Sequence, residues 1–212
     1  DKRAQLTDPD RRSALAAEMD NFMMPIGLQI DFADAYVKRM GAPDPALIGR
    51  RVGDIAAERG CHIAETIIDI ALADDLATSF GLDAIGHNDG AKIARMLADP
   101  LVGIGAGDGG AHVTNFATYG DTGYLFSRFV RGFAAMPLET AVRKLTYDVA
   151  QLWGLRARGL LRPGYAADLV LFDPEAIDRG PEIAVEDLPA PGFRYIRRAM
   201  GIDRVFVNGA LA

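Results

Sequence analysis

The sequence predicts an α/β architecture that is followed by a β-rich segment. Segments with the apolar spacing of helices alternate with short apolar strands up to about residue 155. Beyond that point the run RGLLRPGYAADLVLFDP has no helical period, and DLVLFD is a short β run between Pro-Gly and Asp-Pro turns. With 212 residues, the chain is long enough for one large domain or for one domain with a small appendage.

Several helices and one strand are expected before residue 100. Asp8 is the expected cap of the first helix, Asp44 caps a helix that begins at Pro45, and Gly60 ends that helix. The expected helices are 8–23, 45–60, 61–77 and 89–97, and the expected strand is Ile26–Phe32. Pro100 then stops the last of these helices.

The second half alternates in the same way. The apolar run LVGIGA at 101–106 predicts a strand, and helices are expected at Tyr124–Phe133 and Pro137–Trp153. The stripe of the second helix is expected to be buried, together with Trp153 and Leu155. Strands DLVLFD and RVFVNG follow, the latter leading into an Asn-Gly turn, with the loop RGPEIAVEDLPAPG between them.

Composition excludes several classes of protein. The net charge of −6 and the pI of about 5.1 argue against a nucleic-acid binder, which normally carries a clustered basic face. We expect no membrane span and no signal peptide, because the apolar runs are short and the N-terminus is charged. Cys61 is the single cysteine, so a reducing cytoplasm is the expected location. The chain lacks an initiator Met and stops inside an expected strand, so we expect a piece of a longer polypeptide.

The segment GAGDGG within LVGIGAGDGGAH is the strongest candidate site. It satisfies the pattern G-x-G-x-x-G of dinucleotide-binding loops. That interpretation fails in context, because no helical apolar stripe follows directly and the segment about 20 residues onward, SRFVRG, is basic rather than acidic. Asp108 would also place a negative charge where pyrophosphate should bind.

Metal chemistry suits this loop better. An aspartate after an apolar strand, on a glycine-flanked loop, lies where α/β barrels place their catalytic groups. A carboxylate in that position can contact a divalent metal and accept a proton from the water that the metal binds. Local context leaves one alternative open, namely that Asp108 only caps a turn.

Three blocks of residues together resemble a known family. GDGGAHV, PLETAVRKLTYDVAQLWGL and RGLLRPGYAADLVLFDP, in this order and spacing, resemble the C-terminal half of the metal-dependent amidohydrolases. The sequence is most similar to the branch of N-acyl-D-amino-acid deacylases (D-aminoacylase-like, amidohydrolase family 3). The resemblance is specific over most of residues 90–175 and looser before them.

This resemblance implies a fold and a division of the chain. Residues 1–158 would form the C-terminal part of a TIM-like (β/α)₈ barrel whose eighth strand is LVGIGAG, and residues 159–212 part of a small β-sandwich. Asp108 would be the catalytic residue and a metal ligand, first activating the metal-bound water and then protonating the leaving amine. Gly109 and His112 would contact the substrate.

The same resemblance implies one or two divalent metal ions, Zn²⁺ in the first place. The family holds its metal mainly through histidines on earlier strands, including an H-x-H motif that is absent from this sequence. We therefore expect most ligands to come from outside this segment, in the N-terminal half of the barrel, and the segment alone to be inactive. A homo-oligomer is compatible with the sequence.

Other chemistry-bearing residues have structural alternatives. His112 is tied to the site loop, which favours a site role over a structural hydrogen bond. His87 in GHNDG is expected to cap a helix together with Asn88 and Asp89, and His62 to lie at the surface or in packing at a helix start. Cys61 has no partner pattern for a nucleophile and is expected to be inert.

Two further groups of residues allow either a site role or a structural role. They are Tyr119, Asp121 and Tyr124 after the site loop, and Arg194, Arg197 and Arg198 near the C-terminus. The first group suits either substrate contacts or a surface loop that leads into a helix. For the arginines a solvated face is favoured over an anion site.

The predicted function is metal-dependent cleavage of an amide (C–N) bond in a small molecule, an N-acyl-D-amino acid in the first place. Cleavage of another C–N bond, in a cyclic amide or a carbamate, is the alternative among enzymes. A barrel scaffold that has lost its metal is the alternative from another class.

Overall fold

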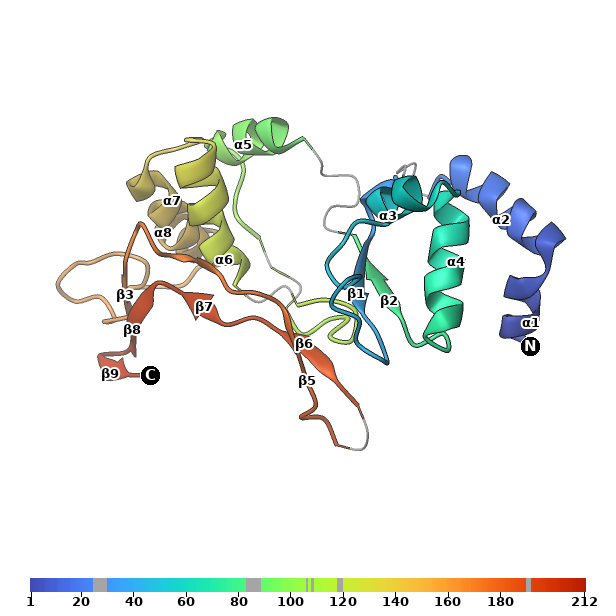
Figure 1. Ribbon diagram of the computed structural model, residues 1–212. Helices are drawn as coiled ribbons and strands as arrows, with labels where there is room; N and C mark the ends of the chain where they lie inside the picture. Colours follow the sequence, from blue (N-terminus) through green and yellow to red (C-terminus); the bar gives the residue numbers. More distant parts are fainter. Residues whose placement is uncertain (25–29, 83–88, 106, 108, 118–119, 190–191) are drawn as a thin grey trace. The chain divides into compact units, whose positions relative to one another are not determined.

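The computed structural model describes residues 1–24, 30–82, 89–105, 107, 109–117, 120–189 and 192–212 (Figure 1). The chain divides into two compact units, Asp1–Asn88 and Asp89–Ala212. Both units mix helices and strands, as the predicted α/β class requires. The barrel, the sandwich and the boundary at residue 158 stay predictions.

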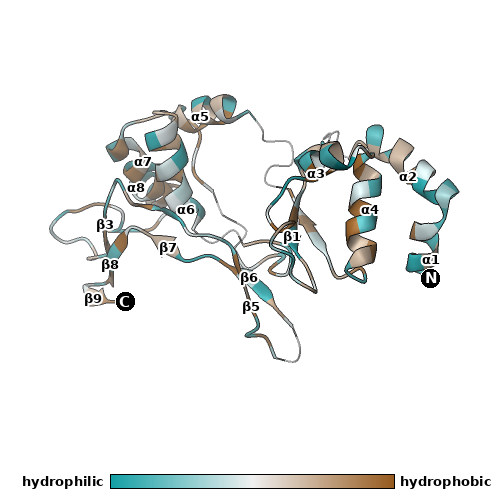
Figure 2. Ribbon diagram, in the orientation of Figure 1, coloured by the Kyte–Doolittle hydropathy of each residue, from teal (hydrophilic) through white to brown (hydrophobic). Residues whose placement is uncertain are grey.

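The first unit has its core between a two-stranded sheet and the two helices α3 and α4. Its helices are α1 (Lys2–Thr7), α2 (Pro9–Asp20), the 3₁₀ turn η1 (Phe32–Asp34), α3 (Val52–Arg59) and α4 (Ile63–Ala73). Strands β1 (Tyr36–Arg39) and β2 (Ser79–Gly81) pair antiparallel, with Val37 opposite Phe80. The fully buried core joins Val37 of the sheet to Ile55 of α3 and Ile70 of α4. Figure 2 shows the hydrophobic residues that run along α4.

Two of the three helix ends predicted in this unit are confirmed, the N-cap at Asp8 and the C-terminus at Gly60. Asp8 accepts hydrogen bonds from the backbone N–H groups of Asp10 and Arg11, at 2.9 and 3.2 Å, and α2 begins with Pro9. Gly60 ends α3 in the left-handed conformation, at φ 64°. A glycine adopts this backbone without a steric penalty, so it terminates the helix cleanly.

Two predictions in the first unit are wrong. The helix expected from Pro45 begins instead at Val52, because residues 49–51 turn back to pair with β1, where Val37 N–H donates to Arg50 O and Gly49 N–H to Val37 O. Asp44 caps only a turn, through Ala46 N–H. The strand expected at Ile26–Phe32 lies largely outside the described residues, and its last residue, Phe32, begins η1 instead of ending a strand.

Helices α5 to α8 and the π-helical turn η2 form the helical half of the second unit. They are α5 (Gly90–Ala98), α6 (Asp121–Tyr124), η2 (Leu125–Gly132), α7 (Leu138–Leu145) and α8 (Tyr147–Leu152). Asp89 caps α5 through Lys92 N–H, as expected. Leu125, Phe126 and Phe129 of η2 are buried in one cluster with residues from α5 and α7.

The helix predicted at Pro137–Trp153 is broken at Thr146. The Thr146 hydroxyl donates to Val142 O at 2.7 Å, a back-bond that bends helices. After the break, Trp153 is 73% exposed and Leu155 48% exposed, and Leu152 of the predicted stripe is 71% exposed. The expectation that these three residues belong to the core is therefore wrong for this chain.

In its described residues, the β-rich part contains three small antiparallel sheets with four strand pairings. Strand β3 (Leu169–Phe172) pairs with β8 (Ile202–Val207), which turns into β9 (Ala210–Leu211). The turn between β8 and β9 is the predicted Asn-Gly turn, with φ of 50° at Asn208 and 83° at Gly209. The other pairs are β4 (Asp178–Arg179) with β7 (Ala199–Met200), and β5 (Ile183–Val185) with β6 (Arg194–Ile196). The strands expected in DLVLFD and RVFVNG are confirmed, and β5 occupies part of the expected loop.

The strand predicted at 101–106 does not form a ladder in its described residues, 101–105. Its start is instead a turn, because Leu101 N–H donates to the Asp99 carboxylate at 2.8 Å and Val102 N–H to Asp99 O at 3.2 Å. Within the described ranges of the chain, no helix is long and apolar enough to cross a membrane.

Candidate active site

The loop that follows the apolar run 101–105 and ends at His112, called the site loop, is the candidate site. Asp108, the predicted catalytic residue, lies outside the described residues, whereas Gly109 and His112 lie within them. Gly109 is exposed in a turn, and Gly110 has a φ of 96° that suits glycine. The loop therefore presents Gly109 to solvent.

His112 has an uncommon backbone conformation. Its φ of 51° is left-handed, which is rare for a residue with a side chain and is concentrated at functional sites. Its carbonyl accepts hydrogen bonds from Asn115 N–H at 2.7 Å and Phe116 N–H at 3.2 Å. The exposed His112 ring lies 5.7 Å from the Phe116 ring, centroid to centroid. His112 is thus bound to the short segment that follows it.

The segment after His112 is bonded to the β5–β6 hairpin. Val113 O accepts from Tyr195 N–H at 2.7 Å, which places this segment beside β6 (Figure 1). Ala117 N–H donates to the Glu182 carboxylate at 2.8 Å, and Ala117 O accepts from Arg197 Nε at 3.0 Å. The downstream end of the loop is consequently held by residues far away in the sequence.

A buried lysine holds the upstream end. Lys144 of α7 is 4% exposed, and its ammonium group donates to Asp99 O and Val102 O, each at 2.7 Å. These carbonyls belong to the turn from which the apolar run starts. Helix α7 is therefore tied directly to the backbone that leads into the site loop.

The residues expected after the loop are engaged with an arginine. Tyr119 lies outside the described residues. The Arg179 guanidinium stacks 3.7 Å from the centroid of the Tyr124 ring and lies 3.7 Å from an Asp121 carboxylate oxygen. Burial raises the pKa of Asp121 above its ordinary value, although the charges of Arg179 and Arg197 oppose this shift. This arrangement favours the structural alternative for Asp121 and Tyr124.

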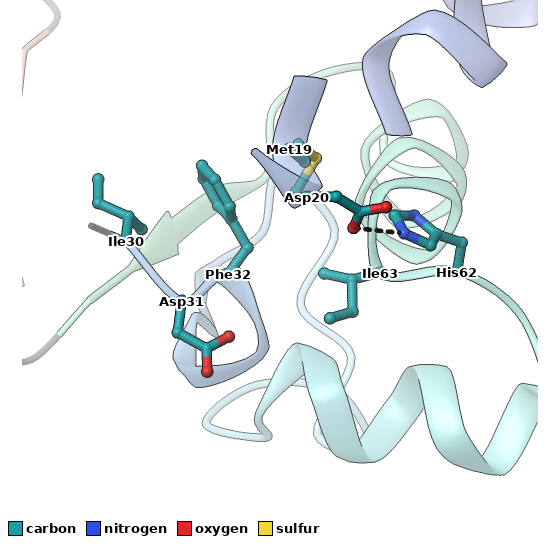
Figure 3. Close-up of a pocket in the computed structure, with 7 residues that line it drawn as sticks. All are labelled: Met19, Asp20, Ile30, Asp31, Phe32, His62 and Ile63. Carbon is teal, nitrogen blue, oxygen red and sulfur yellow. Dashed lines mark hydrogen bonds and ion pairs between the residues drawn. The ribbon is translucent and has the colours of Figure 1, made fainter. Parts of the chain in front are cut away.

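His62 has a structural role. Its Nδ1 accepts from Ala64 N–H at 3.1 Å and caps α4, so the neutral ring carries its proton on Nε2, which donates to the Asp20 carboxylate at 3.0 Å. Figure 3 shows this pair in a surface hollow of about 530 Å³, with Asp31 and Phe32 also lining it. Both ring nitrogens are used, which confirms the expected place at a helix start.

The remaining candidates divide in the same way. His87 lies outside the described residues. Cys61 Sγ lies 3.2 Å from the Thr66 hydroxyl, which agrees with an inert thiol near a helix start. Arg198 is exposed, and Arg194 forms a two-point surface pair with Asp187 at 2.7 and 2.8 Å.

Arg197 contradicts the prediction of a solvated face. Its side chain is 18% exposed, and its guanidinium donates to two backbone carbonyls. The reason is that the β5–β6 hairpin is bonded to residues 113–117, which follow the site loop. The local sequence carries no signal for this long-range contact.

The described residues do not by themselves form a metal centre. Among them, no group of three or more His, Cys, Asp or Glu side chains is arranged to hold a metal ion. His62 is unavailable because both of its ring nitrogens are hydrogen-bonded. A zinc ion requires about four ligands, so this part of the chain does not fit a complete zinc site.

Comparison with known proteins identifies relatives across most of the chain. A model of the amidohydrolase family matches residues 37–210. The D-aminoacylase of Alcaligenes xylosoxydans xylosoxydans is 34% identical over 170 residues, which cover 79% of this chain and 31% of that enzyme. The N-acyl-D-aspartate deacylase of the same organism is 32% identical over 169 residues, covering 78% and 30%.

A solved structure is also similar. It is an N-acyl-D-glutamate deacylase from Bordetella bronchiseptica, complexed with zinc and a phosphonate inhibitor, with 27% identity and a TM-score of 0.49. The match covers 87% of this chain and 36% of that one. The chain thus spans about 30% of the length of the curated relatives that it matches.

Proposed function

Because the chain belongs to the amidohydrolase family, we propose that its protein is a metal-dependent hydrolase that cleaves a C–N bond in a small-molecule amide. The observation that carries this proposal is the family match over residues 37–210, which spans the whole site loop. The substrate class that we propose is the N-acyl-D-amino acids, because the curated relatives include D-aminoacylase and N-acyl-D-aspartate deacylase.

In this proposal the site loop transfers a proton and contacts the substrate. Asp108 accepts a proton from the attacking water and returns it to the leaving amine. Gly109 and His112 contact the substrate from the same loop, which the exposure of both residues allows. When bound, a divalent metal ion, zinc in the first place, polarises the scissile carbonyl.

The proposed fold supplies the metal ligands that the described residues do not bring together. We place residues 1–158 in the C-terminal part of a TIM-like barrel and residues 159–212 in a small β-sandwich, with the other metal ligands on the remainder of a longer polypeptide. The relatives, about three times as long as the matched segment, support this placement. Leu101, Trp153 and Leu161 are 93%, 73% and 87% exposed, as expected of apolar side chains that further chain covers.

The direct test is hydrolysis by the full-length, zinc-loaded protein. We expect N-acetyl-D-amino acids to be cleaved and their L enantiomers to be left intact, with the released amine measured by a colorimetric assay. Asp108→Asn removes the proton acceptor and is expected to lower kcat by about 10²–10⁴-fold. Asp203→Asn, at an exposed carboxylate on β8, is the matched control and should leave kcat unchanged.

Other results would select the alternatives. Cleavage of cyclic amides or carbamates in place of N-acyl-D-amino acids would correct the substrate class. A full-length protein that binds no metal and cleaves none of these compounds would instead be a barrel scaffold.

A further inference from the structure

Glu182 and Arg197 hold both backbone groups of a single residue in the segment after the site loop. One Glu182 carboxylate oxygen accepts from Ala117 N–H at 2.8 Å, and Arg197 Nε donates to Ala117 O at 3.0 Å. The same carboxylate oxygen lies 3.5 Å from a terminal nitrogen of Arg197. The two partners of one ion pair therefore grip Ala117 from its donor and its acceptor side.

The β5–β6 hairpin explains why these two side chains meet. Its register places Ile183 opposite Ile196, so the next pair outward along the strands is Glu182 and Arg197. Arg197 is further fixed by a hydrogen bond to Gly180 O at 3.0 Å. Both side chains are mostly buried, at 12% exposure for Glu182 and 18% for Arg197, so water competes weakly for these contacts.

The grip is transmitted to the site loop through a few bonds. Tyr195 N–H of the same hairpin holds Val113 O, so the segment is fixed at both of its ends. Between those ends, the N–H groups of Asn115 and Phe116 donate to His112 O. The residue with the left-handed backbone, His112, is thereby bonded to a segment that is itself hydrogen-bonded to the hairpin.

We propose that Glu182 and Arg197 are positioning residues that fix the loop bearing Gly109 and His112 for catalysis. This role rests on the proposed function, because it assigns the loop to amide hydrolysis. Neither side chain contacts substrate in this account; both act through the backbone of Ala117. Since small misplacements of reacting groups are costly, loosening the grip lowers turnover rather than abolishing the fold.

The test combines hydrogen exchange with kinetics in the full-length, zinc-loaded protein. Glu182→Ala is expected to speed amide exchange in a peptide that covers residues 113–117 by about tenfold, and to lower kcat by about 10- to 100-fold. Glu182→Gln keeps an oxygen that accepts from Ala117 N–H, so it should restore most of both values. Asp187→Ala is the matched control, because it removes the ion pair between Asp187 and Arg194 on the same hairpin and leaves the bonds to Ala117 in place.

Kinetics are measured well below the unfolding temperature of each variant, so that a loss of global stability does not lower kcat. An active wild type in which Glu182→Ala leaves the exchange or kcat unchanged would overturn the positioning role alone. Equal losses in Asp187→Ala and Glu182→Ala would also overturn it, since the effect would then belong to the hairpin as a whole. A wild type without hydrolase activity would overturn the proposed function, and the catalytic role of the pair with it.

Discussion

Asp74 illustrates how one side chain organises a turn in the first unit. Its carboxylate accepts hydrogen bonds from Gly41 N–H and Ala42 N–H, each at 2.8 Å, and from the Thr78 hydroxyl at 2.7 Å. The bond from Ala42 N–H, followed by those from Thr78 and Gly41, holds the pKa of Asp74 below its ordinary value. The ionised carboxylate therefore joins the end of α4 to the turn after β1.

This lowered pKa predicts an acid-sensitive contribution to stability. Above the pKa of Asp74 in the unfolded chain the contribution is fully present, and it is lost as the pH falls through the lower, folded value. We expect Asp74→Asn to reduce the stability at pH 7 and to flatten its decrease under acid conditions. Urea unfolding midpoints between pH 7 and pH 2 measure both effects. Asp75→Asn, at the neighbouring exposed carboxylate, should retain the wild-type pH profile.

Residues that bond locally were predictable, and residues that bond across the sequence were not. Asp8 and Asp89 cap helices that start directly after them, so their neighbours announce the role. Glu182 and Arg197 look like ordinary charged residues near a Pro-rich loop, and their partner, Ala117, lies far away in the chain. A single sequence, taken by itself, carries no signal for such a contact.

Among the elements, α7 depends on its buried lysine. Lys144→Met keeps the apolar stem but removes the donors to Asp99 O and Val102 O. We expect a loss of about 2–3 kcal/mol in the free energy of unfolding, because two part-buried backbone carbonyls lose a charged donor. Chemical denaturation of the full-length protein measures this loss.

The control for this change is Lys92→Met on α5, whose side chain is 74% exposed and pairs with Asp89 at the surface. An exposed pair of this kind contributes about 0–1 kcal/mol, so the control should change stability little. Equal effects of the two variants would contradict the role assigned to Lys144.

Elements with a clear period were predicted best. Helices α2, α4 and α5 and strands β3 and β8 lie where their patterns indicate. Prediction was wrong where long-range pairing overrode local preference, as at residues 49–51 beside β1, or where a side chain bent a helix, as at Thr146. In the apolar run 101–105, Asp99 and Lys144 take the backbone bonds that would start a strand.

At the scale of the whole molecule, two features of this segment agree with its membership of a family whose curated relatives are about three times as long as the matched segment. The exposed apolar side chains of Leu101, Trp153 and Leu161 agree with the proposed barrel, in which further chain covers them. The set of metal donors, which is incomplete among the described residues, agrees with it as well. The sequence shows the motif of the candidate loop, and the role of that loop stays a prediction. The proposed chemistry depends on Asp108, so its test is a structure that shows whether the Asp108 carboxylate lies beside a metal ion.

The crystal structure of the full-length protein loaded with zinc, with anomalous data collected at the zinc edge, tests this placement most directly. We predict an anomalous peak within about 2.0–2.2 Å of an Asp108 carboxylate oxygen, with the other ligands supplied by histidines from outside this segment. A zinc-free structure, or a zinc ion in a site remote from the Asp108 carboxylate, would contradict the account.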